Sequence, residues 1–131
     1  MMNRFQRIRQ DHSRETAEDY VELVASLIEE KGEARAVDLA DRLGISQVTV
    51  SKTIQRLKSE GLLISEKYRS IRLTADGSAM AERARRRHEI VLGMLIKLGV
   101  PKDVAEVDAE GIEHHVSEKT LLVFESFLKK S

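Results

Sequence analysis

The chain has 131 residues, of which 41% are hydrophobic and 34% charged, and it contains no cysteine. This balance suits a folded helical protein and excludes a disordered one, while the lack of cysteine excludes a disulfide framework, a zinc-thiolate site and thiol chemistry. The 22 basic residues equal the 22 acidic ones, so nucleic-acid binding would need local clustering of positive charge. No apolar run is long enough to span a bilayer and no signal peptide opens the chain, so we expect a cytoplasmic protein.

The first elements expected are a basic arm and a helix. Residues 1–15 are polar and rich in arginine but have no apolar stripe, which indicates a flexible arm. An apolar stripe at helical spacing then predicts a helix over about residues 16–31. Asp19 and Glu22 lie one turn apart on a flank of this helix. Taken alone, they are interpreted as first-turn acids that complement the helix dipole.

Residues 34–63 have the layout of a helix-turn-helix. A short apolar helix is followed by Gly44 at the turn and by Ser46, which can cap a second helix. Short polar groups near the start of that helix and basic groups further along are what a major-groove reader needs. The alternative is an ordinary helical hairpin whose polar face is merely hydrated. The predicted DNA-contacting residues of this segment are Ser46, Gln47, Thr49, Ser51, Lys52, Gln55 and Arg56.

Two short β-favouring runs follow, at residues 62–64 and 71–73, on either side of a polar turn. A two-stranded wing directly after a helix-turn-helix is typical of a winged helix. Lys67, Arg69 and Arg72 would then contact backbone phosphates, which position a protein on DNA without reading its sequence.

The last third of the chain is expected to be helical. Thr74 can cap a helix that runs to about residue 98, and Ser117 can cap a final helix. Residues 90–98 and 121–128 carry more apolar surface than a small subunit can cover. We therefore expect these two segments to hold a homodimer together.

An acidic octapeptide, residues 108–115, lies between those two segments. In a helix, Glu110, Glu113 and His114 stand at i, i+3 and i+4 and project from one face, whereas His115 points about 100° away from His114. Two carboxylates and an imidazole on one face make half of a divalent-metal site. An acidic surface helix with a capping histidine is the alternative, and the octapeptide alone leaves both interpretations open.

Three pieces of the chain together carry a family resemblance: residues 16–22, the step Arg87-His88-Glu89, and residues 110–115. They resemble the manganese transport regulators, the small branch of the diphtheria toxin repressor family, and the resemblance covers roughly residues 16–127. It implies a mostly α fold, with a winged helix-turn-helix DNA-binding domain over residues 1–74 and a helical metal-binding and dimerisation domain over residues 75–131. We expect the extra C-terminal SH3-like domain of larger family members to be lacking.

The resemblance also implies the site. Its six metal ligands would be Asp19, Glu22, His88, Glu110, Glu113 and His114, with His115 in the motif but not a direct ligand. Iron-responsive relatives have sulfur-containing residues at the positions of Asp19 and Glu113, and the oxygen ligands found here suit a hard ion such as Mn²⁺. The chain is thus expected to bind Mn(II), two ions per subunit, and then double-stranded operator DNA as a homodimer. It would repress manganese uptake genes, without a membrane or a small-molecule substrate as partner.

Other functions stay open at this point. One is an iron-responsive repressor of the same family. Another is a two-metal hydrolase, since clustered carboxylates and histidines also serve catalysis. We expect no enzyme, because no nucleophile, acid–base pair or substrate cradle accompanies the cluster. A third is a metal-independent winged-helix regulator with an incidental acidic helix.

Overall fold

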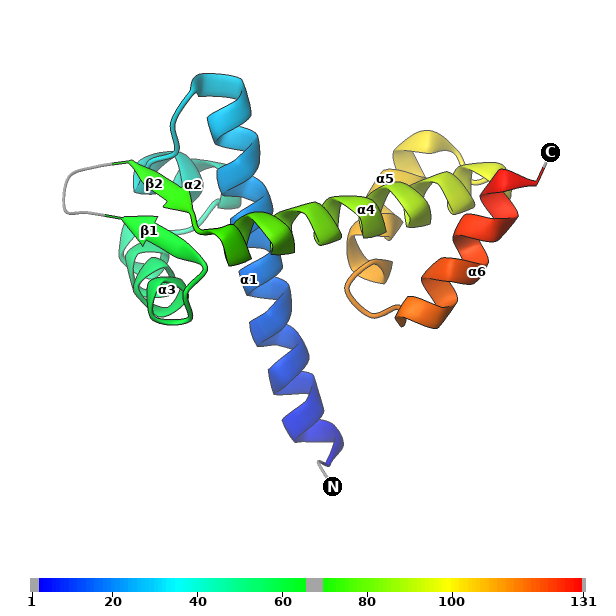
Figure 1. Ribbon diagram of the computed structural model, residues 1–131, viewed down its shortest axis with the longest axis horizontal. Coiled ribbons are helices and arrows are strands. Elements are labelled where there is room, and N and C mark those ends of the chain that lie inside the picture. The colour runs from blue at the N-terminus through cyan, green and yellow to red at the C-terminus, as the bar shows by residue number, and fades with distance from the viewer. Residues whose placement is uncertain (1–2, 66–69, 131) are drawn as a thin grey trace. The chain divides into compact units, whose positions relative to one another are not determined.

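The computed structural model describes residues 3–65 and 70–130. In chain order its elements are α1 (Arg4–Lys31), α2 (Ala36–Leu43), α3 (Gln47–Ser59), β1 (Leu63–Ser65), β2 (Ile71–Leu73), α4 (Ala75–Lys97), α5 (Lys102–Ile112) and α6 (Glu118–Lys129) (Figure 1). This order of six helices and one two-stranded sheet among the described residues confirms the predicted mostly α fold with a small wing. Within the described residues, no helix combines the length and apolar character that crossing a membrane requires.

The described residues form two compact units. One runs from His12 to Glu82, and the other joins the residues from Arg83 onward to those up to Asp11. The chain passes from one unit to the other inside α1 and again inside α4. The division expected from the family resemblance, after residue 74, coincides with the start of α4 and remains a prediction.

The start of α1 differs from the sequence-based expectation. Residues 4–15 belong to the helix, so the prediction of a flexible arm before a helix at residue 16 is wrong for them. A reciprocal pair of hydrogen bonds begins the helix: the Gln6 backbone N–H donates to Asn3 Oδ1 at 2.9 Å, and the Asn3 N–H donates to Gln6 Oε1 at 3.0 Å. The first turn contains no acid, and Asp19 and Glu22 lie far inside the helix. Their interpretation as first-turn acids is therefore also wrong.

The core of the His12–Glu82 unit is built on one stripe of α1. Tyr20, Val24 and Leu27 recur at helical spacing and are 3%, 0% and 0% exposed. They belong to one cluster of buried residues with Leu39 of α2 and Leu57 of α3. The cluster fixes the helix-turn-helix against α1 by burial of apolar surface, the main stabilising term in folding.

The turn between α2 and α3 forms as predicted. Gly44 has φ of +68°, a backbone conformation that favours glycine, and its N–H donates to Ala40 O at 2.9 Å. The Ser46 hydroxyl oxygen then accepts from the Thr49 backbone N–H at 3.2 Å. The predicted glycine turn and serine cap are both confirmed.

The wing is a two-stranded antiparallel sheet in which Ile64 pairs with Arg72. Its base is tied to the start of α4 by Thr74, whose hydroxyl donates to Gly61 O at 2.6 Å and accepts from the Gly77 N–H at 2.9 Å. Gly77 lies against the Leu62 carbonyl so closely that a Cβ at this position would overlap it. The wing therefore depends on a close contact that only glycine permits.

The unit that contains the residues from Arg83 onward, called the second unit below, has a core of its own. Ile90 and Val91 of α4, Ala109 of α5 and Leu121 of α6 are buried together. Ile90, Val91 and Leu121 come from the two segments expected to face a partner subunit, so parts of both segments are used inside the subunit. The large apolar residues that stay exposed on α4, α5, α6 and the residue after α4 are Ile96, Leu98, Val104, Val107, Ile112, Leu122, Val123 and Phe127.

Candidate metal centre and nucleic-acid interface

Three of the predicted metal ligands lie together in the second unit. His88 comes from α4, Glu110 from the last turns of α5, and Glu113 from the residue directly after α5. His88 Nδ1 lies 2.6 Å from Glu113 Oε2 and 3.6 Å from Glu110 Oε1. One donor atom of each residue lies within 4.8 Å of the others, which is close enough for the three to hold one ion.

Glu113 is the most unusual member of this cluster. It is 1% exposed, and its Oε1 atom is buried without a hydrogen-bond partner among the described residues. Burial raises the pKa of the Glu113 carboxyl, as does the nearby charge of Glu110, while the hydrogen bond from His88 acts in the opposite direction. A buried carboxylate with one unsatisfied oxygen is costly unless a cation compensates it. The donor set thus fits a divalent metal ion.

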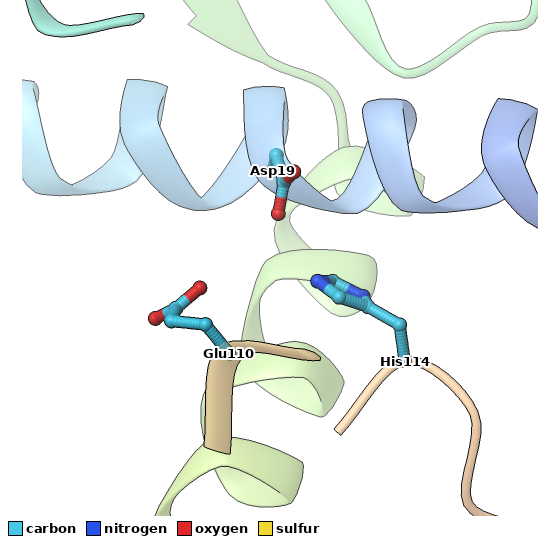
Figure 2. A group of neighbouring side chains, drawn as sticks. All are labelled: Asp19, Glu110 and His114. Carbon is cyan, nitrogen blue, oxygen red and sulfur yellow. The ribbon is translucent and has the colours of Figure 1, made fainter. Parts of the chain in front are cut away.

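The helix α5 ends before the last two of the three ligands that were expected on one helical face. The helix ends at Ile112, but Glu113 keeps helical backbone angles (φ −59°, ψ −30°), and its N–H donates to Ala109 O at 2.9 Å. The face shared by Glu110 and Glu113 therefore exists. His114 lies in the turn beyond the helix, so the prediction that it is a helical neighbour of Glu110 is wrong, although its side chain is buried. Figure 2 shows the side chains of Glu110 and His114 on their backbone.

The other predicted ligands come from a different part of the fold. Asp19 and Glu22 are one turn apart on α1, in the unit that carries the helix-turn-helix; Figure 2 also draws the Asp19 side chain on its helix. Their assignment as ligands stays a prediction. His115, which the sequence leaves outside the ligand set, has a half-exposed side chain 3.9 Å from Asp11 Oδ2.

The predicted DNA-contacting surface lies on α3 and the wing. Thr49 is exposed in the first turn of α3, Lys52 further along it, and Arg72 on β2. Ser46, Gln47, Ser51 and Gln55 are also exposed. Lys67 and Arg69 fall outside the described residues.

Arg56 stands apart from this exposed set. Its guanidinium donates to the Ser13 hydroxyl at 2.9 Å and to the Ser13 carbonyl at 3.4 Å, which links α3 to α1. Its Nε atom is buried and lies 3.9 Å from Glu60 Oε1. The sequence predicts Arg56 as a DNA contact and gives no indication of these partners within the chain.

Sequence reasoning also missed an apolar residue of the same surface. Val48 is 66% exposed in the first turn of α3, between the polar residues Gln47 and Thr49. Helical spacing could have found it, because Val48 falls off the buried stripe formed by Val50, Ile54 and Leu57. Ile45, which directly precedes the Ser46 cap, is also an exposed apolar residue, at 40%.

Comparisons with known proteins agree with both parts of the fold. The model of the iron-dependent repressor N-terminal DNA-binding domain matches residues 12–71, and that of the iron-dependent repressor metal-binding and dimerisation domain matches residues 74–131. The transcriptional regulator MntR of Escherichia coli O6:H1 is 50% identical over 126 residues, which is 96% of this chain and 81% of that protein. The regulator MntR of Bacillus subtilis (strain 168) is 43% identical over 100 residues, which is 76% of this chain and 70% of that protein.

Solved structures show the same relationship. A manganese-dependent transcriptional repressor in complex with manganese superposes with a TM-score of 0.77 at 29% identity, covering 86% of this chain and 52% of that one. The regulator IdeR of T. acidophilum gives a TM-score of 0.74 at 28% identity, covering 84% and 53%. The chain therefore spans about half the length of these solved relatives.

The proteins that this chain resembles are transcriptional regulators and not enzymes, which removes support for a two-metal hydrolase. Both halves of the chain match one family, and the Escherichia coli O6:H1 relative shares half of its residues over nearly its whole length. The chain thus belongs to the iron-dependent repressor family, which is the diphtheria toxin repressor family named above, and within it to the branch of the manganese transport regulators.

Proposed function

We propose that this protein is a manganese-responsive transcriptional repressor that binds Mn(II) and then double-stranded operator DNA as a homodimer, and so represses manganese uptake genes. The observation that carries the metal half of this proposal is Glu113, a buried carboxylate with one hydrogen-bonded oxygen and one buried oxygen without a hydrogen bond among the described residues. The DNA half rests on a capped, exposed recognition helix followed by a two-stranded wing. We expect the protein to act in the cytoplasm and to have no small-molecule substrate.

The proposed ligands belong to both units of the chain. They are Asp19 and Glu22 of α1, together with His88, Glu110, Glu113 and His114. Four carboxylates and two imidazoles balance the charge of two Mn²⁺ ions, which supports two ions per subunit. All six donors are oxygen or nitrogen atoms, and such a set suits a hard ion better than thiolate or thioether ligands do.

Metal dependence follows from the charge of this ligand set. At about 5 Å and an effective dielectric constant of about 20, each pair of carboxylates repels by roughly 3 kcal/mol. Bound Mn²⁺ supplies positive charge that reverses the sign of this interaction. Asp19 and Glu22 lie on α1, and the buried stripe of α1 packs in one cluster with α2 and α3. A metal ion bound by Asp19 and Glu22 would therefore bias the placement of the recognition helix.

On the DNA side, the proposed contacts divide by chemistry. The short polar groups at the start of α3 would read base edges, and the exposed Val48 suits the methyl group of thymine. The basic residues would bind phosphates. The proposed base-reading residues are Ser46, Gln47, Thr49 and Ser51. The proposed backbone contacts are the basic Lys52 and Arg72 and the uncharged amide of Gln55, with Lys67 and Arg69 outside the described residues.

The direct test is operator binding by chelated protein titrated separately with Mn²⁺, Fe²⁺ and Zn²⁺. We expect weak binding after chelation and strong, saturable restoration by Mn²⁺. A larger response to Fe²⁺ would point to the iron-responsive alternative in the same family. Operator binding that is indifferent to the chelator would instead mean that the protein is a metal-independent regulator.

A further inference from the structure

The contact between Arg56 and Ser13 joins the two helices that the proposed function connects. Arg56 lies near the end of α3, the recognition helix, and Ser13 lies on α1. Both terminal nitrogens of the guanidinium bind the same residue, one to its hydroxyl at 2.9 Å and one to its carbonyl at 3.4 Å. Two donors on one residue fix direction as well as distance, as the planar guanidinium fork allows.

A second observation separates Arg56 from Lys52 of the same helix. Its Nε atom is buried and lies 3.9 Å from Glu60 Oε1, and both terminal nitrogens of its guanidinium are directed at Ser13. Lys52, one turn earlier, is exposed. Donors directed at α1 are not available to a DNA phosphate without breaking these contacts, whereas the ammonium of Lys52 is.

We propose that Arg56 is a positioning residue that fastens the recognition helix to α1 and thereby makes operator binding sensitive to the placement of that helix. The proposal rests on the proposed function, since α1 carries the proposed ligands Asp19 and Glu22. These lie six and nine residues beyond Ser13, roughly 9 and 14 Å along one helix. A shift of α1 on metal binding is thereby passed to α3 through hydrogen bonds from a charged group, in addition to core packing.

The experiment measures operator affinity with excess Mn²⁺ and with chelator, and takes the ratio as the metal enhancement. Ser13→Ala removes the hydroxyl partner and keeps the helix, because alanine is a better helix former than serine. Ser26→Ala, at an exposed serine of the same helix, is the matched control. Arg56→Lys keeps the positive charge but loses the two guanidinium donors that bind Ser13. Lys52→Ala removes an exposed cation from the same helix.

We expect Ser13→Ala and Arg56→Lys to lower the metal enhancement by about three- to tenfold, the effect of one or two hydrogen bonds. Ser26→Ala should leave it unchanged. In the double variant of Ser13→Ala with Arg56→Lys, the loss should be smaller than the product of the single losses, since both changes remove the same contact. Unfolding temperatures of all variants establish that the comparison concerns folded protein.

Salt dependence separates a positioning residue from a phosphate contact. Lys52→Ala should lower the slope of log affinity against log salt by about one, and Arg56→Lys should leave it as in the wild type. The proposal is overturned if Ser13→Ala retains the full metal enhancement. It is also overturned if Arg56→Lys binds the operator as the wild type does while Arg56→Ala lowers the salt slope as Lys52→Ala does, because Arg56 would then be a phosphate contact. Absence of any metal enhancement in the wild type would instead defeat the proposed function itself.

Discussion

His88 Nδ1 and Glu113 Oε2 lie 2.6 Å apart and join the middle of α4 to the end of α5. This hydrogen bond satisfies one oxygen of a carboxylate whose other oxygen is buried without such a bond in the described part of the chain. Because the two residues are 25 positions apart, they come together only when the second unit is folded. The arrangement of the two Glu113 oxygens, one hydrogen-bonded and one not, therefore depends on the fold of this unit and not on the local sequence.

We expect Glu113→Gln to abolish Mn²⁺-dependent DNA binding and to stabilise the metal-free protein near neutral pH. Glutamine keeps the shape and a polar partner for His88 but removes the buried charge. The raised pKa of Glu113 means that the folded state binds a proton more tightly than the unfolded state, so the wild type loses stability as pH rises through the folded pKa. The stability difference between variant and wild type should shrink as pH falls.

Thermal unfolding with chelator, between about pH 5 and pH 8, measures this difference. Glu106→Gln, at an exposed acid of α5, the helix that precedes Glu113, serves as the control and should change neither the metal response nor the pH dependence. A metal-free Glu113→Gln variant that is less stable than the wild type across this range would contradict the argument from burial.

Asp19→Met should change the preferred metal. Methionine removes one charge and one hard oxygen while keeping a good helix former at the position, so the response should shift from Mn²⁺ toward Fe²⁺ or Co²⁺. Because Asp19 lies deep inside α1, loss of a helix-dipole interaction cannot account for a change in this variant. Operator binding titrated with each metal measures the shift, with Glu29→Met, at an exposed acid of α1, as the control. An unaltered Mn²⁺ preference would refute the assignment of Asp19.

Val107→Lys should weaken the homodimer. Val107 is 73% exposed on α5, and it lines an open cavity of about 530 Å³ with Gly111, Ile112 and Val116. A valine buried at a twofold interface contributes twice, at roughly 1.5–3 kcal/mol each, so the dimer dissociation constant should rise by about 100-fold or more. Sedimentation equilibrium measures it, and Val37→Lys, at an exposed valine of α2, should leave the dimer intact. Equal dissociation constants for Val107→Lys and wild type would place the interface elsewhere.

Two substitutions on α3 should affect DNA binding in different ways. Gln47→Ala should change which bases are preferred, at about 1–3 kcal/mol for the affected position, whereas Lys52→Ala should weaken all sequences alike. Competition between a set of single-base operator variants separates the two effects. If both substitutions leave operator affinity unchanged, the recognition surface lies on another element.

Gly77→Ala should destabilise the His12–Glu82 unit. An added Cβ would overlap the Leu62 carbonyl and displace the wing from α4, and overpacking of this kind costs about 1–3 kcal/mol. Denaturant unfolding measures the loss. Ser78→Ala, at the exposed neighbouring position, should be nearly neutral; a neutral Gly77→Ala would show that the wing can move away without cost.

The parts of the fold that the sequence predicts correctly are those that local chemistry determines. Gly44 and Ser46 fix the turn and the start of α3 through bonds to residues within four positions, so the printed sequence is sufficient. The start of α1 was mistaken because the first residues lack an apolar stripe. The helix begins instead at the capping pair Asn3 and Gln6, whose side chains bind each other's backbone N–H groups. Such a cap leaves no trace in the hydrophobic periodicity.

The candidate site was predictable only in part. Helical spacing correctly put Glu110 and Glu113 on one face, but it could not show that the helix ends at Ile112 and leaves His114 in a turn. Nor can spacing reveal the contact between Arg56 and Ser13, which are 43 positions apart. Such contacts depend on how α1 and α3 pack, and the polar pattern of α3 is the same whether Arg56 faces DNA or the protein.

The burial of Tyr20 has a consequence for spectroscopy. The chain has two tyrosines and no tryptophan, and Tyr20 is 3% exposed and adjacent to Asp19 in the sequence, while Tyr68 falls outside the described residues. The near-ultraviolet absorption and emission of the protein therefore come from tyrosine without tryptophan background. Because Mn²⁺ is paramagnetic and quenches nearby fluorophores, tyrosine emission of the unlabelled protein can be followed during a metal titration, with no dye or substitution introduced beside the proposed site.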